Sequence, residues 1–186
     1  LAGQSPDDRN ALTGQAHFLR ALFYFDLVRA YAYAPGTAGQ VPAGQDRGGV
    51  PLLLSGITDE AQITLPARAP VAEVYALIYS DLLAAIAELA SPSASQGPRF
   101  ATRAGAQALL ARAALYNRDW PTAVRYATAA LAGSPRLLAD SAASVAGWRV
   151  ASHPEAIFEL AFAPNENPGQ NFSLQATFTT LTAPGN

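Results

Sequence analysis

Apolar side chains dominate the first helical pattern of the chain, between Ala11 and about Ala32. They recur on nearly every side of the helix that this segment would form, so most of that helix is expected to lie in the core. Asn10 or Thr13 is expected to cap its start. The aromatic residues that the spacing places in the core are Phe18, Phe23 and Phe25, and the polar positions are His17, Arg20, Asp26 and Arg29.

A long insertion separates this helix from a second one. Residues 34–70 are rich in proline and glycine, and loops of more than about 15 residues are usually functional or disordered. From Val71 to about Ala90 the apolar residues follow the three-and-four spacing of an amphipathic helix. Pro70 stands just before it, where a helix start tolerates proline. The apolar face comprises Val71, Val74, Tyr75, Ile78, Leu82, Ile86 and Leu89.

Residues 103–135 carry the pattern of one tetratricopeptide repeat, in which two close helices fill about 34 residues. A tight turn at Arg118–Asp119 separates the two predicted helices, and Trp120 follows it, where a bulky residue normally packs between helices. The matching positions are Leu110, Ala111, Ala114, Trp120, Ala123, Ala127, Ala130, Leu131 and Pro135. The predicted helices at 11–32 and 71–90 are expected to form a similar hairpin, with its turn expanded into loop 34–70.

The last quarter of the chain changes character. Residues 136–152 are expected to be irregular. Residues 155–162 suggest a short strand with Phe158, Leu160 and Phe162 on one face, and residues 172–179 alternate apolar and polar side chains as a strand does. The pattern therefore predicts a single, mainly α-helical module over residues 1–186. It would consist of helical hairpins 11–90 and 103–135 and a strand and loop region over residues 136–186.

Composition excludes several classes of function. The net charge is -2 and no basic run is present, so nucleic acid is not an expected partner. The chain has no cysteine, which excludes disulfides and thiolate sites within it. No apolar run approaches the roughly 20 residues that span a bilayer. Because the chain starts at Leu1 and contains no methionine, we expect it to be a piece of a longer protein.

Four motifs in order resemble the SusD/RagB family over residues 15–162. They are the helix FLRALFYFDLVRAYAY (18–33), the helix VAEVYALIYSDLLAAIAEL (71–89), the run ATRAGAQALLARAALYNRDWPTAVRYATAAL (101–131), and Glu155, Ile157, Phe158 and Glu159 of a short strand. The family's Gly-Gly-Val-Pro-Leu turn is present at residues 48–52, displaced by about a dozen residues.

The resemblance implies a role at the bacterial cell surface. Family members are similar in being lipid-anchored to the outer membrane, facing outward, and docking on a SusC-like TonB-dependent transporter. They capture oligosaccharides or polysaccharides and are not enzymes. For this chain we therefore expect a glycan ligand, a transporter partner on the helical face and a lipid anchor outside the sequence, with no cofactor. A tetratricopeptide adaptor that binds a peptide is the alternative.

Aromatic side chains with a wet edge are the best candidates for glycan contact, because sugars stack on such rings. Trp148, beside Arg149 in an irregular stretch, ranks first, and Tyr31 and Tyr33 at the start of the long loop come next. Partial burial under the adjacent strand is the competing expectation for Trp148.

No catalytic or metal-binding constellation stands out. The two histidines, His17 and His153, are far apart in sequence, and His17 is expected to make a structural hydrogen bond. Glu155 and Glu159 would lie roughly 13 Å apart on a strand, which is too far for a glycosidase pair at about 5–10 Å. Asp26 and Arg29, three residues apart on a helix, are expected to form an ion pair.

Overall fold

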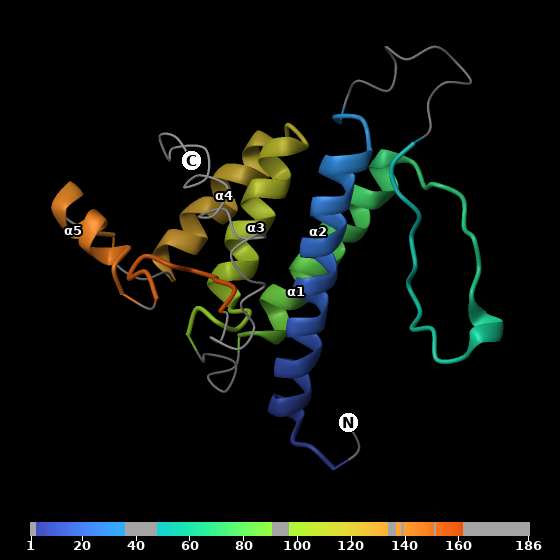
Figure 1. Ribbon diagram of the computed structural model, residues 1–186, viewed down its shortest axis with the longest axis horizontal. Coiled ribbons are helices and arrows are strands. Elements are labelled where there is room, and N and C mark those ends of the chain that lie inside the picture. Colours follow the sequence, from blue (N-terminus) through green and yellow to red (C-terminus); the bar gives the residue numbers. More distant parts are fainter. Residues whose placement is uncertain are drawn as a thin grey trace, which may run out of the picture.

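Four long helices build the body of the protein, as seen in a computed structural model that describes residues 3–35, 48–90, 97–133, 137–138, 140–150 and 152–161. The helices are α1 (Pro6–Tyr31), α2 (Val71–Glu88), α3 (Arg103–Tyr116) and α4 (Trp120–Ala132). The described part of the long insertion contains one 3-10 turn, η2 (Glu60–Gln62), and the short helix α5 (Ser141–Gly147) follows α4 (Figure 1).

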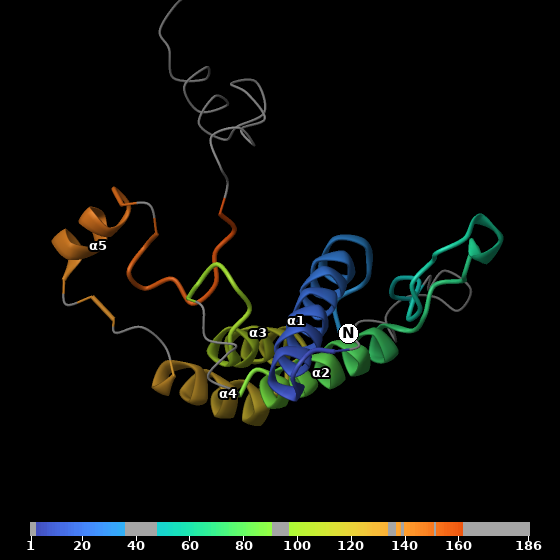
Figure 2. The ribbon, with the colours of Figure 1, turned by 90° about the horizontal axis from the view of Figure 1, so that it is seen from below.

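Each long helix packs against the next one along the chain, and α1 also meets α3. Figure 2 shows the result, with α1 and α3 in one layer and α2 and α4 in the other. This is the arrangement of two stacked helical hairpins, and it confirms the predicted mainly α-helical, tetratricopeptide-like fold.

Side-chain caps stand at the starts of α1 and α4. Ser5 accepts a hydrogen bond from the Asp8 N–H (3.1 Å), and Pro6 occupies the first turn, so α1 begins five residues before the predicted start. The prediction that Asn10 or Thr13 caps this helix is wrong, because Thr13 lies inside α1 and donates to the Arg9 carbonyl (3.0 Å). Asp119 caps α4 by accepting from the Thr122 N–H (3.3 Å).

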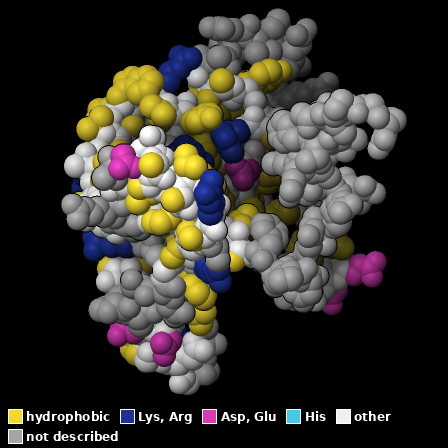
Figure 3. Space-filling model, turned by 60° about the vertical axis from the view of Figure 1, so that its left-hand side comes forward, with side chains coloured by type: hydrophobic (Ala, Val, Ile, Leu, Met, Phe, Trp, Pro, Cys, Tyr) yellow, Lys and Arg dark blue, Asp and Glu magenta, His cyan; other side chains and the backbone are white. Residues whose placement is uncertain are grey.

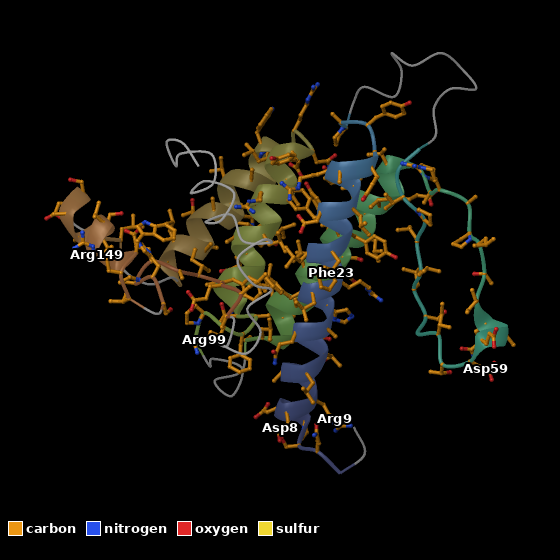
Figure 4. The ribbon with its side chains drawn as sticks, viewed as in Figure 1. Asp8, Arg9, Phe23, Asp59, Arg99 and Arg149 are labelled. Atoms are coloured by element: carbon orange, nitrogen blue, oxygen red, sulfur yellow. The ribbon has the colours of Figure 1, made fainter. Side chains whose placement is uncertain are left out.

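One continuous core joins α1, α2 and α3. Its largest fully buried side chains are Phe25, Val74, Ile78, Leu82 and Leu110. Two aromatic predictions are wrong. Phe23 is 59% exposed because it lies on an outer stripe of α1, and Trp120 is exposed because the buried positions of α4 are the small residues Ala123 and Ala130. Figure 4 shows Phe23 midway along α1.

One ion pair and one further hydrogen bond link α1 to α2. Arg20 Nε and Nη2 donate to the two carboxylate oxygens of Asp81 at 2.7 and 2.6 Å, and Asp81 is almost fully buried. The bond to Asp81 raises the pKa of the Arg20 guanidinium. His17 Nδ1 lies 2.7 Å from Glu88 Oε2, which confirms the predicted structural hydrogen bond of His17.

The second part of the long insertion, residues 48–69, is closed at its two ends by backbone hydrogen bonds next to the start of α2. The Gly49 N–H donates to the Ala69 carbonyl (2.6 Å), and the Ala69 N–H donates to the Val50 carbonyl (3.1 Å). Gly48 has a φ of +69°, and a Cβ there would lie 2.9 Å from the Ala69 oxygen, so only glycine fits without strain. We call residues 48–50 and 69 the loop base.

The C-terminal region differs from its prediction. Residues 155–161 form no strand, because the Glu159 N–H pairs with the Pro98 carbonyl (2.8 Å) and not with a neighbouring ladder. Phe158 instead packs edge-on against Phe18, with ring centroids 4.9 Å apart. Helix α5 forms in a stretch expected to be irregular, capped by Asp140. The strand predicted at 172–179 lies outside the described residues.

Candidate functional site

Trp148 stands at the C-terminal end of α5 and is 77% exposed. Its ring lies 4.7 Å from the ring of His153, at an angle of 44°. The competing expectation, burial under an adjacent strand, is wrong because that strand does not form among the described residues. The result is an indole whose free face is open to solvent beside the exposed Arg149, a chemistry suited to stacking on a flat, partly apolar ligand.

His153 packs against the C-terminal end of α5. Its Nδ1 accepts a hydrogen bond from the Glu155 N–H (3.2 Å), so a neutral ring carries its proton on Nε2. That Nε2 is buried, with no hydrogen-bond partner in the described part of the chain. It lies against Gly147, where an added Cβ would come within 2.7 Å of it. Glycine at the end of α5 therefore permits the close approach of the His153 ring to Trp148.

Tyr31 and Tyr33 lie at the C-terminal end of α1. Tyr31 is the last residue of the helix and is exposed, whereas Tyr33 is half-buried. The Tyr31 carbonyl accepts a hydrogen bond from Arg68, whose Nε also donates to the Gly49 carbonyl (2.7 Å). The exposed ring of Tyr31 therefore lies at the end of α1, and Arg68 connects the backbone carbonyl of this residue to Gly49 of the loop base.

The structure does not bring the four predicted residues together. Helix α5 and Arg149 lie on one side of the body, and the end of α1 lies beside the insertion on the other (Figures 1, 2 and 4). Figure 3 turns the α5 side forward and shows hydrophobic side chains gathered over it, with arginines among them. Trp148 with Arg149 and Tyr31 with Tyr33 are therefore two separate candidate surfaces.

Sequence reasoning missed an aromatic cluster around Arg29. The guanidinium lies 4.7 Å from the ring centroid of Phe25 and 5.6 Å from that of Tyr116, and these two rings meet edge-on at 5.3 Å. Arg29 also pairs with Asp26, as predicted. Hydrogen bonds to Asp26 and Tyr116 raise the pKa of Arg29. Tyr116 comes from α3, and its position at the end of that helix gave no signal of this contact.

The two carboxylates considered for hydrolysis have structural partners. Glu155 accepts a hydrogen bond from the Leu138 N–H. Glu159 lies 3.6 Å from Arg99. Among the described residues, no group of three or more His, Asp or Glu side chains could hold a metal ion. Within the same residues, no helix has the length and apolar character needed to cross a membrane.

Comparison with known proteins gives one consistent family. The sequence model described as "Starch-binding associating with outer membrane", of the SusD-like group, matches residues 2–115. No curated protein matches the chain.

Several solved structures share the fold. A SusD-like carbohydrate binding protein from Bacteroides vulgatus is 27% identical, with a TM-score of 0.72 over 89% of this chain and 33% of its own. A SusD superfamily protein from the same species is 26% identical, with a TM-score of 0.67 over 89% of this chain and 36% of its own. A SusD superfamily protein from Bacteroides thetaiotaomicron, at 22% identity and a TM-score of 0.70 over 91% and 35%, shares the fold alone.

The chain spans about a third of the length of these solved structures. The family match covers more than half of the 186 residues and includes the motifs of α1, the loop base, α2 and most of α3. The protein therefore belongs to the SusD-like family.

Proposed function

We propose that this protein is a glycan-binding subunit on the outer face of a bacterial outer membrane, where it delivers oligosaccharides or polysaccharides to a SusC-like TonB-dependent transporter. It binds its ligand without cleaving it. A lipid anchor outside the present sequence would hold it to the membrane. The family description and the carbohydrate-binding relative support this assignment.

The observation that carries the proposal is the ring of Trp148. This ring is a large apolar surface exposed to water. The ring of His153 contacts it, and the guanidinium of Arg149 is next in sequence. A sugar ring would cover the exposed face with its C–H groups, and Arg149 would donate to hydroxyl oxygens. Tyr31 and Tyr33 are the second proposed contact, for a separate stretch of a long glycan.

Calorimetric titration of the 186-residue chain with starch, other plant glycans, and host and microbial polysaccharides tests the proposal. We expect at least one glycan to bind, with no change in its size after incubation. Trp148→Ala should weaken binding at least tenfold, and Trp148→Phe, which keeps a flat ring, should retain most of it. Trp120→Ala is the matched control, since Trp120 is also exposed but lies on α4.

Three results would contradict the proposal. Equal weakening by Trp148→Ala and Trp120→Ala would remove the site from Trp148. Shortening of the glycan would show hydrolysis. Absence of binding to every polysaccharide, together with binding of an unstructured peptide, would favour the tetratricopeptide adaptor.

A further inference from the structure

His153 begins a turn that follows α5. Its carbonyl accepts a hydrogen bond from the Ala156 N–H (2.9 Å), and Pro154 occupies the next position, where such turns favour proline. The imidazole closes the same turn a second time, because its Nδ1 accepts from the Glu155 N–H (3.2 Å). The side chain therefore acts as an acceptor, in the way that asparagine and aspartate side chains do in turns.

The acceptor role of Nδ1 requires a neutral ring. An imidazolium carries a proton on both nitrogens and has no acceptor, so protonation of His153 removes its hydrogen bond with the Glu155 N–H. The other nitrogen offers no compensation, since Nε2 is buried without a hydrogen-bond partner in the described part of the chain. Burial of an unpaired charge is costly. A charged ring should therefore leave this position.

The groups around His153 do not offset such a charge. The ring lies against the end of α5 and against its own turn. The ionisable side chains on these elements are Asp140, Arg149 and Glu155. Each carboxylate already accepts a hydrogen bond from a backbone N–H, and Arg149 has the same sign of charge as an imidazolium. Within the described residues, neither carboxylate forms an ion pair with His153.

The neutral ring of His153 contacts the indole of Trp148. Their centroids lie 4.7 Å apart, and Trp148 is 77% exposed. In the described part of the chain, no second aromatic ring stacks with or meets this indole edge-on. The orientation that Trp148 presents to a ligand therefore depends on where His153 lies.

We propose that His153 is a positioning residue of the Trp148 site, which holds the indole only while its ring is neutral, so that acid weakens glycan binding there. This inference rests on the proposed glycan site. The charge of a histidine changes between about pH 5 and pH 8, and apparent affinity falls with the fraction of protein in the binding-competent form. The protein would hold its glycan at neutral pH and release it in acid.

The first test needs no glycan. The sequence contains two tryptophans, so Trp120→Phe leaves Trp148 as the only indole in the 186-residue chain. We expect its fluorescence to change in one step between about pH 8 and about pH 5, because the ring that contacts the indole changes its charge and position. Adding His153→Asn should abolish this step, since an asparagine oxygen can accept from the Glu155 N–H but does not titrate.

The second test measures affinity by calorimetric titration with soluble starch, or with the polysaccharide of the panel that binds most tightly. Wild type should bind about tenfold more weakly at pH 5 than at pH 8, whereas His153→Asn should bind equally at both. His153→Phe keeps a ring but no acceptor, so at pH 8 it should bind as weakly as wild type does at pH 5. His17→Gln is the matched control, because His17 contacts Glu88 between α1 and α2, and it should follow wild type.

Two results would overturn the proposal. One is a fluorescence step that persists in His153→Asn. The other is wild-type affinity at pH 5 that equals or exceeds the affinity at pH 8, as would occur if a charged imidazole held the indole by a cation–π contact. Absence of binding to every glycan, with the fluorescence step intact, would instead overturn the glycan site and its acid release, while the positioning of Trp148 by His153 would stand.

Discussion

The two helical hairpins are held together by different interactions. Between α1 and α2 the contact contains large side chains, such as Phe25 and Ile78, and the pair of the partly exposed Arg20 with the buried Asp81. In α3 and α4 every buried residue except Leu109 and Leu110 is alanine or glycine. The first hairpin therefore depends on specific polar geometry, and the second on close approach of its backbones.

This difference separates two ways of fixing helix register. A bidentate ion pair on a buried carboxylate is satisfied in one alignment of α1 on α2, so it selects that alignment even where its net stabilisation is small. Alanine surfaces gain dispersion contacts only when the helix axes are close, so they favour a short distance between the axes but not one alignment. Substitutions should therefore destabilise the first hairpin when they remove a polar partner, and the second hairpin when they add volume.

The largest effect is expected when the polar pair of the first hairpin is broken. Arg20→Ala leaves the Asp81 carboxylate buried without its partner and should lower the free energy of unfolding by about 3 kcal/mol. The double variant Arg20→Met/Asp81→Leu should recover most of that loss. Urea unfolding of the three proteins measures it. If the double variant is as unstable as Arg20→Ala, the ion pair contributes net stability and does more than remove the cost of an unpaired Asp81 carboxylate.

The second hairpin should respond to added volume. Ala114 of α3 is fully buried, and Ala114→Leu should lower the free energy of unfolding by about 2 kcal/mol through overpacking. Ala127→Leu, at an exposed position of α4, is the matched control and should change it by less than about 0.5 kcal/mol. Similar unfolding midpoints for the two variants would show that the small residues are not needed for close approach.

High pH should weaken the first hairpin through Tyr75. Burial raises the pKa of Tyr75 to about 12, above the unfolded value of about 10. The stability from this group is complete below pH 10 and falls as the pH rises towards 12, by about 1 kcal/mol at pH 11. Comparing wild type with Tyr75→Phe in urea at pH 8 and pH 11 measures the difference. An identical decline in both proteins would refute it.

The smallest effect on stability is expected outside both hairpins. Trp148→Ala should change the free energy of unfolding by less than about 0.5 kcal/mol, because its ring is largely in water. Thermal unfolding of the variant provides the measurement. A loss of about 2 kcal/mol would mean that the contact with His153 stabilises the fold and that the ring is a structural element.

The helical part of the fold could be predicted because its signals are local. Pro70 and the three-and-four spacing placed α2 correctly from Val71, and the turn at Arg118–Asp119 placed α3 and α4. Arg118 adopts a φ of +60° in that turn. The exposure of Phe23 could not be read from α1, because a helix that is apolar on nearly all sides does not show which side is covered.

The candidate sites were only partly predictable. Trp148 was identified by its residue type and irregular context, but its contact with His153 depends on the path of the chain after α5. The pairing of Arg20 with Asp81 and of Arg29 with Tyr116 joins residues 61 and 87 positions apart in sequence. Such contacts follow from how the hairpins stack, which a single sequence does not encode in its periodicity.

The loop base has a consequence for how this family can diversify. Because Gly49 and Val50 bond to Ala69 next to α2, the placement of the loop base at the start of α2 follows from these bonds and does not depend on the length of the chain that precedes Gly48. Doubling the length of a flexible loop adds only about 0.6 kcal/mol of closure entropy. Evolution can therefore lengthen or shorten that stretch freely, and the dozen additional residues before Gly48 are the kind of change that this attachment tolerates.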